Sequence, residues 1–195
     1  KDVPVKYIFL SFLIVFFTSC GIQSIPKSVN EVEAKWAEVI NQYKRRSDLI
    51  PALVNTVKGS AAHERETLEA VIQARANATK TQINFDQLNK NSLQKFQKAQ
   101  GALSSALSRL MVTVEKYPQL QANQSFQKLQ NQLEGTENRI AVARKRYIES
   151  IKEFNNLISV PPTSFTNSIF YNHDKKPQFT VENIEEVQKA PQVNF

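Results

Sequence analysis

The stretch that decides the fold reads Gln42-Tyr43-Lys44-Arg45-Arg46-Ser47-Asp48-Leu49-Ile50-Pro51-Ala52-Leu53-Val54-Asn55-Thr56-Val57-Lys58. Two arginines and an aspartate stand directly before apolar residues at helical spacing, so a charged layer joins a core-facing stripe. Pro51 lies inside that stripe, although a proline in a helix interior costs about 3 kcal/mol. We expect the helix to continue through Pro51 with a kink, and a restart capped by Asp48 is the alternative.

The composition on either side of this stretch favours helices. The chain has 195 residues with only 4 glycines and 1 tryptophan, which argues against a loop-rich or sandwich fold. Gln, Lys, Ala, Leu and Glu are frequent, and these residues favour helix formation. We therefore predict an all-α domain with an appendage at each end.

Apolar periodicity predicts where the first three helices lie. The first begins at Ser28, whose spacing to Glu31 matches a capping box. The second covers residues 61–80. The third starts near Phe85 and stops at Pro118, which pushes the preceding residue out of the α region.

The fourth predicted helix has the clearest period in the chain. Its apolar residues recur every seven positions at Phe126, Leu133, Ile140, Tyr147 and Phe154. Gly135 weakens this helix by about 1 kcal/mol relative to alanine, so we expect close packing there. Pro161 and Pro162 end it. Long amphipathic helices with short connections predict an antiparallel four-helix bundle over residues 28–160.

The two ends of the chain differ from this domain. Residues 161–195 have no sustained period but retain aromatic residues, so we expect an extended tail that packs on the bundle, with partner binding as the alternative. Residues 1–19 have the layout of a signal peptide, with a basic residue, an apolar run from Tyr7 to Phe17 and small residues. Eleven helical residues span only about 17 Å, short of the roughly 30 Å hydrocarbon core.

The end of this leader suggests a lipid anchor. Phe17-Thr18-Ser19-Cys20 resembles a bacterial lipoprotein box, which makes Cys20 the predicted lipidated residue and residues 20–27 a lipidated cysteine and linker. Since Lys6 and Lys27 enclose a stretch without charge, an uncleaved anchor is the alternative. Either outcome tethers the domain to a membrane, outside the cytoplasm, in the bacterial cell envelope. Gly21 would fit onward sorting to an outer membrane where the cell has one.

The sequence offers no cofactor, metal or catalytic motif. A single cysteine excludes an intramolecular disulfide and a multi-cysteine metal site. Neither His63 nor His173 follows a glutamate by three residues, as inward-facing di-iron motifs require, and Thr67 replaces the second histidine of a zinc-protease motif. We do not expect an enzyme.

The net charge of +7 does not identify a ligand. Its basic residues are spread along the predicted helices, and no nucleic-acid motif accompanies them, so nucleic acid is not an expected partner.

Three blocks of the sequence resemble the LemA family. The first is Arg45-Arg46-Ser47-Asp48-Leu49-Ile50-Pro51-Ala52-Leu53-Val54, the second Glu115-Lys116-Tyr117-Pro118-Gln119-Leu120-Gln121-Ala122-Asn123, and the third Thr136-Glu137-Asn138-Arg139-Ile140-Ala141-Val142-Ala143-Arg144. The ending Pro191-Gln192-Val193-Asn194-Phe195 is similar as well. The resemblance implies a membrane-anchored, extracytoplasmic helical bundle without an established biochemical activity.

The charged residues in these blocks form our candidate site. They are Arg45, Arg46, Asp48, Glu115, Glu137 and Arg144. We predict that several meet as a polar network inside or at one end of the bundle, where buried charges must be paired. The alternative is a set of exposed pairs, each worth less than about 1 kcal/mol.

These patterns favour a scaffold, adaptor or binding module in the cell envelope. The expected partners are the membrane, an envelope protein and, as a further option, a second copy of the chain. The alternative function is lipid binding or membrane remodelling through a basic helical face and the aromatic tail.

Overall fold

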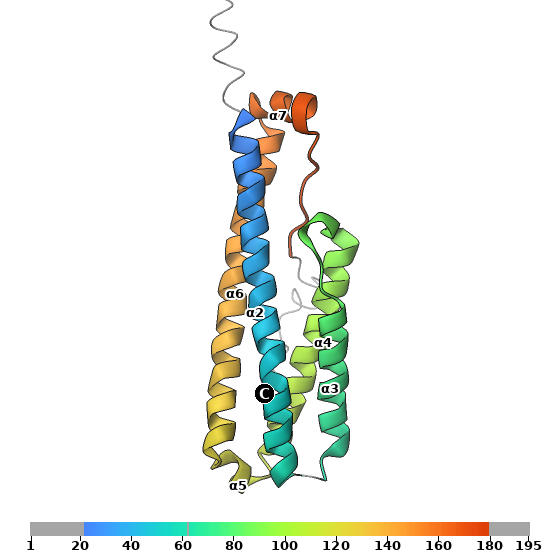
Figure 1. Ribbon diagram of the computed structural model, residues 1–195, viewed down its shortest axis with the longest axis vertical. Helices are drawn as coiled ribbons and strands as arrows, with labels where there is room; N and C mark the ends of the chain where they lie inside the picture. Colours follow the sequence, from blue (N-terminus) through green and yellow to red (C-terminus); the bar gives the residue numbers. More distant parts are fainter. Residues whose placement is uncertain (1–21, 62, 180–195) are drawn as a thin grey trace, which may run out of the picture.

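The computed structural model describes residues 22–61 and 63–179, and every regular element in those residues is a helix. Four long helices run along the long axis of the molecule (Figure 1). They are α2 (Ser24–Ser60), α3 (Arg65–Lys80), α4 (Lys90–Val114) and α6 (Gln124–Ser159). The short elements are η1 (Phe85–Gln87), α5 (Pro118–Gln121), α7 (Thr163–Thr166) and η2 (Asn167–Tyr171). The predicted all-α fold is confirmed.

The long helices pack mainly in pairs. α2 runs along α6, α3 runs along α4, and α2 also contacts α3, whereas α4 and α6 approach each other little. α3 and α4 are shorter, so α2 and α6 extend beyond them at the end that carries α7 (Figure 1). The helix pairs therefore share a complete core at one end of the molecule only.

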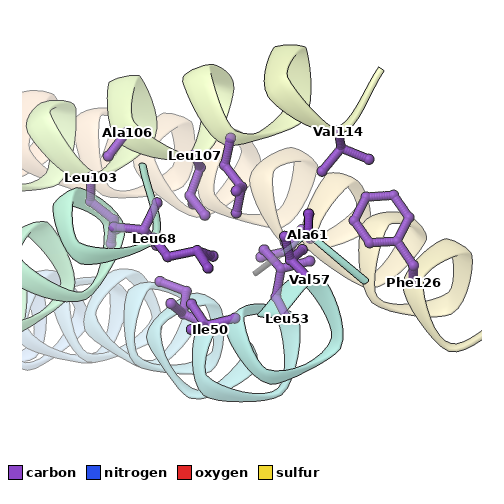
Figure 2. Packing of buried hydrophobic residues seen from close by; sticks show 14 of the residues in the cluster. Ile50, Leu53, Val57, Ala61, Leu68, Leu103, Ala106, Leu107, Val114 and Phe126 are labelled. Atoms are coloured by element: carbon purple, nitrogen blue, oxygen red, sulfur yellow. The ribbon is translucent and has the colours of Figure 1, made fainter. Parts of the chain in front are cut away.

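The buried apolar side chains form two clusters. The aliphatic cluster contains Ile50, Leu53, Val54, Val57, Ala61, Leu68, Val71, Ala78, Leu103, Ala106, Leu107, Leu110, Val114, Leu120, Phe126 and Leu133. The aromatic cluster contains Ile25, Val32, Trp36, Val39, Tyr43, Ile83, Leu88, Leu93, Phe96, Ile140, Ala143, Tyr147, Ile151, Phe154 and Ile158. Figure 2 shows aliphatic-cluster side chains from all four long helices pointing toward one another.

α2 begins earlier than the sequence predicted. It starts at Ser24, so the expected linker before Ser28 is wrong over residues 24–27. Pro26 lies in the first turn, where backbone N–H groups have no intrahelical partner and proline is tolerated. Ser28 and Glu31 consequently lie within the helix and do not cap it.

The third predicted helix is divided in two. η1 comes first, and α4 then begins after Asn89, whose side chain accepts from the backbone N–H of Ser92 in a capping box. α4 ends at Val114, before the expected stop at Pro118. Tyr117 has φ −120° and ψ 80°, outside the α region as predicted.

The expectation of close packing at Gly135 is wrong. A side-chain Cβ placed on this glycine would meet no atom within 4 Å. The weak helix-forming residue in α6 is therefore not explained by a tight helix contact.

The segment after α6 is only partly extended. Residues 163–171 form α7 and η2, and the Thr163 hydroxyl joins the start of α7 to the end of α6 by donating to the carbonyls of Leu157 and Val160. Residues 172–179 have no helix and return along α6, where the Asn155 side chain exchanges two hydrogen bonds with the Lys176 backbone, at 3.1 and 2.9 Å. The remaining tail, residues 180–195, lies outside the described residues.

Candidate functional site

Pro51 leaves one backbone carbonyl of α2 without its usual partner. A helical carbonyl accepts from the N–H four residues later, and Pro51 has no N–H, so the carbonyl of Ser47 lacks that bond. Arg75 of α3 replaces it, because its Nε donates to Ser47 O over 2.8 Å. Ser47 Oγ also lies 3.2 Å from Thr79 Oγ1. α2 continues through Pro51, as predicted, and its freed carbonyl becomes a contact with α3.

Arg46 lies one residue earlier and is enclosed, with 1% of its surface exposed. Its Nη1 donates to Glu137 Oε1 over 2.5 Å and to Ser104 Oγ over 2.8 Å. Its Nη2 donates to the side-chain oxygen of Gln100 over 2.6 Å and to the Gln100 carbonyl over 3.3 Å. The Arg46 side chain of α2 thus connects α4 and α6 through hydrogen bonds.

These contacts form a polar layer across the four long helices. The layer consists of Arg46, Ser47, Arg75, Thr79, Gln100, Ser104 and Glu137. On α2 it lies between Tyr43 of the aromatic cluster and Ile50 of the aliphatic cluster. It therefore separates the two apolar cores at one level of the molecule.

The charges in this layer are unequally exposed. The Glu137 side chain is 47% exposed and supplies the negative charge that balances the enclosed Arg46. Nε of Arg46 has no hydrogen-bond partner, and the guanidinium carbon lies 5.1 Å from the centroid of the Tyr43 ring. Burial raises the pKa of Tyr43, although the nearby positive charges of Arg144 and Arg46 act in the opposite direction. Tyr43 is consequently neutral at neutral pH. Its ring packs against the Arg46 guanidinium and borders the layer.

Three of the six predicted site residues lie at or near this layer. Arg46 and Glu137 meet directly, and Arg144 lies close enough to Tyr43 for its positive charge to act on the Tyr43 hydroxyl. The Arg144 guanidinium also lies 4.6 Å from the centroid of the Phe179 ring. Arg144 therefore links the layer to the last described residue of the tail.

The other three predicted residues lie elsewhere. Successive helical residues are rotated by about 100°, so Arg45 and Asp48 face outward when Arg46 faces the core. Both are exposed, as is Glu115, which follows the end of α4. Arg45 lines a shallow surface pocket of about 550 Å³ together with Lys128 and Arg139.

Sequence reasoning missed the uncharged members of the layer and one charged member, Arg75. Gln100 interrupts the apolar spacing of α4 between Phe96 and Leu103, and a buried polar residue in such a stripe indicates a partner. Arg75 carries no such signal, because its role depends on the Ser47 carbonyl of another helix.

A groove between α4 and α6 gives access to one edge of the layer. It has a volume of about 450 Å³ and includes Ser104 and Glu137. The remaining lining residues are Leu107, Ser108, Met111, Gln130, Leu133 and Glu134. Its walls thus combine three apolar side chains with polar ones and two carboxylates, of which Glu137 is the one bound to Arg46.

Residues 22–61 and 63–179 contain neither a cluster of metal ligands nor a helix that could span a membrane. No three His, Cys, Asp or Glu side chains in this part gather as metal ligands would, and His63 is exposed. None of its helices combines the length and apolar character needed to cross a bilayer. The predicted signal peptide and Cys20 lie outside the described residues.

Comparison with known proteins identifies one relationship. The family model described as the LemA family matches residues 35–195. This match covers the whole polar layer and most of the long helices. No curated protein matches the chain.

Proposed function

We propose that this chain, which belongs to the LemA family, is a membrane-anchored scaffold or adaptor on the extracytoplasmic side of a bacterial cell envelope. In this proposal, its four long helices form one antiparallel bundle. The tether is either lipid on Cys20 or an uncleaved apolar leader, and the sequence from Lys6 to Cys20 supports both forms.

The enclosure of Arg46 is the observation that carries a non-enzymatic role. A catalytic group must reach a substrate, whereas Arg46 is 1% exposed and its terminal nitrogens donate to residues of its own chain. A buried ion pair adds little net stability, but it penalises arrangements that leave the charge unpaired. Arg46 and its partners in the polar layer thus align the long helices.

The groove between α4 and α6 offers the best surface for an adaptor. Leu107, Met111 and Leu133 provide apolar contacts, and the exposed Glu134 provides a negative charge, since Glu137 already balances Arg46. A helix or extended segment with apolar side chains and one cation fits this pattern. The proposed partner is therefore a segment of an envelope protein.

The tether is tested by isolating the full chain from its native membrane. Mass spectrometry is expected to find either a chain that begins at a lipidated Cys20 or an intact leader. Recovery of the chain in the soluble fraction would overturn the membrane anchor.

The adaptor role is tested by photo-crosslinking in the native envelope. A crosslinker at Ser108, in the groove, is expected to capture one defined envelope protein, and the same crosslinker at Ile72 on α3 serves as the matched control. Equal capture at both positions contradicts a partner site in the groove. Capture of a second copy of the chain identifies self-association instead.

The non-enzymatic assignment has its own test. The purified full chain is screened against hydrolase substrates, and no turnover is expected. Turnover that Glu137→Gln abolishes, while the circular dichroism spectrum is unchanged, would overturn the assignment.

A further inference from the structure

Exposed apolar side chains gather at one end of the molecule. Among the described residues, eight large apolar side chains are exposed, and five belong to this end: Ile22, Val160, Phe165, Ile169 and Phe170. Phe165, Ile169 and Phe170 are 64%, 73% and 64% exposed. Scattered surface apolar residues are normal, but a cluster marks a contact surface.

Most of this cluster belongs to a structured segment of the chain. α7 and η2 form a cap, residues 163–171, at the end where α2 begins (Figure 1). The Asn167 side chain accepts from the His173 backbone N–H over 3.0 Å and donates to the His173 carbonyl over 3.1 Å. The His173 ring stacks on Tyr171 and lies edge-on to Phe154. These hydrogen bonds and ring contacts therefore hold the cap in one conformation, with its apolar residues exposed.

The cap also lacks charged residues. No Asp, Glu, Lys or Arg occurs between Glu153 and Asp174, a stretch that includes the end of α6 and the whole cap. The N-terminal stretch between Lys6 and Lys27 is equally free of these residues. Among the described residues, the start of the chain from Ile22 to Pro26 lies beside the cap and also carries no charge, which suits a surface in contact with lipid.

The cap is joined to the start of α2 by a direct contact. The Tyr171 hydroxyl donates to the Ile22 carbonyl over 2.6 Å. A lipid on Cys20 would lie two residues away, and two residues reach at most about 7 Å. The proposed tether therefore brings this end, and no other, to the bilayer surface.

We infer that the cap inserts Phe165, Ile169 and Phe170 into the lipid interface, so that the bundle stands upright on the membrane. This inference rests on the proposed membrane tether. Phe165 and Ile169 are four residues apart and share one helical face, and amphipathic segments bury such a face about 5–10 Å into the headgroup region. A lipid bilayer explains the location of the cluster beside the tether, which an unrelated protein partner would not require.

The inference is tested with the full chain reconstituted in bilayers that contain brominated lipids, which quench tryptophan fluorescence on contact. Trp36 is the only tryptophan and is 2% exposed, so wild type provides the baseline. Phe170→Trp places a probe in the cap. Val142→Trp is the control, because residue 142 is 49% exposed and lies about 27 Å from Val160 along α6. We expect at least twofold greater quenching of the added fluorescence in Phe170→Trp.

Each result separates the tether from the cap. Protein that floats with vesicles but shows equal quenching in both variants keeps the tether and overturns the cap insertion. Protein that does not float overturns both. A further variant, Phe165→Ser combined with Phe170→Ser, should leave thermal unfolding unchanged and raise quenching of Val142→Trp, because the bundle loses its upright orientation. No rise in that quenching contradicts the inference.

Discussion

The two apolar clusters of this molecule are built differently. The aliphatic cluster draws on all four long helices and contains one aromatic residue, Phe126. The aromatic cluster receives no residue from α3, and it fills its volume with Trp36, Tyr43, Phe96, Tyr147 and Phe154. Large aromatic side chains therefore fill the core where α3 contributes no residue.

This difference explains why the tail returns along α6. The ring of Phe179 lies 6.1 Å from that of Trp36 and 5.5 Å from that of Tyr147, measured between centroids. The aliphatic end is closed by helices alone, whereas the aromatic end also uses a non-helical segment. Because the non-helical residues 172–179 help to cover the aromatic cluster, we expect lower local stability at that end.

The largest expected effect is the loss of Trp36. Trp36→Ala should lower the free energy of unfolding by about 4 kcal/mol, because it removes a buried ring and the hydrogen bond from Nε1 to the Ile83 carbonyl. Leu110→Ala, at the aliphatic end, should cost about 3 kcal/mol. Urea unfolding measures both. A greater loss from Leu110→Ala would break the contrast between the clusters.

Removal of the Phe179 ring should loosen the aromatic end alone. Phe179→Ala is expected to cost about 2 kcal/mol, less than a fully buried ring because Phe179 is half-buried. Hydrogen exchange should accelerate in residues 172–179 and remain unchanged around Leu53. Phe165→Ala, an exposed control, should have no measurable effect. Uniform acceleration along α2 would show that the two ends do not open separately.

The link between Pro51 and Arg75 should appear in a double-mutant cycle. Arg75→Ala is expected to cost about 1.5 kcal/mol, since it leaves the Ser47 carbonyl without a donor. In a Pro51→Ala background, the new N–H can bond to that carbonyl, so the same change should cost about 1 kcal/mol less. Equal costs in both backgrounds would show that Arg75 does not substitute for the missing helix bond.

The smallest effect concerns alkaline pH. Burial raises the pKa of Tyr43 and of Tyr147 above the ordinary value near 10. The folded chain therefore holds protons that the unfolded chain releases, and stability should fall as pH rises above about 10. Tyr43→Phe with Tyr147→Phe should flatten this fall in urea-unfolding measurements. An unchanged slope in the double variant would assign the alkaline loss to other groups.

The fold was predictable where one periodic pattern decided it. The seven-residue spacing from Phe126 to Phe154 is enough to predict α6, and Pro161 and Pro162 mark its end. The helix starts were less predictable, because Ser28 and Glu31 match a capping box in spacing but lie inside α2. A local motif cannot show whether the chain is already helical before it.

The site was predictable only for charged residues in recognisable blocks. Arg46 and Glu137 both lie in blocks that resemble the LemA family, and they contact each other. Gln100 offered a signal in the apolar stripe of α4, whereas Arg75 and Ser104 offered none. Their roles come from atoms of other helices, and spacing along one helix does not encode which residue of a neighbour lies opposite.

The proline of α2 has a consequence for how distant relatives can be found. The Ser47 carbonyl and its arginine are 28 positions apart, yet the need for one is created by the ring at position 51. A relative that retains this proline should supply a donor from its second long helix, while a relative that replaces the proline is freed from that demand. The proline and the arginine are therefore expected to change together among relatives, because the one removes the hydrogen bond that the other replaces.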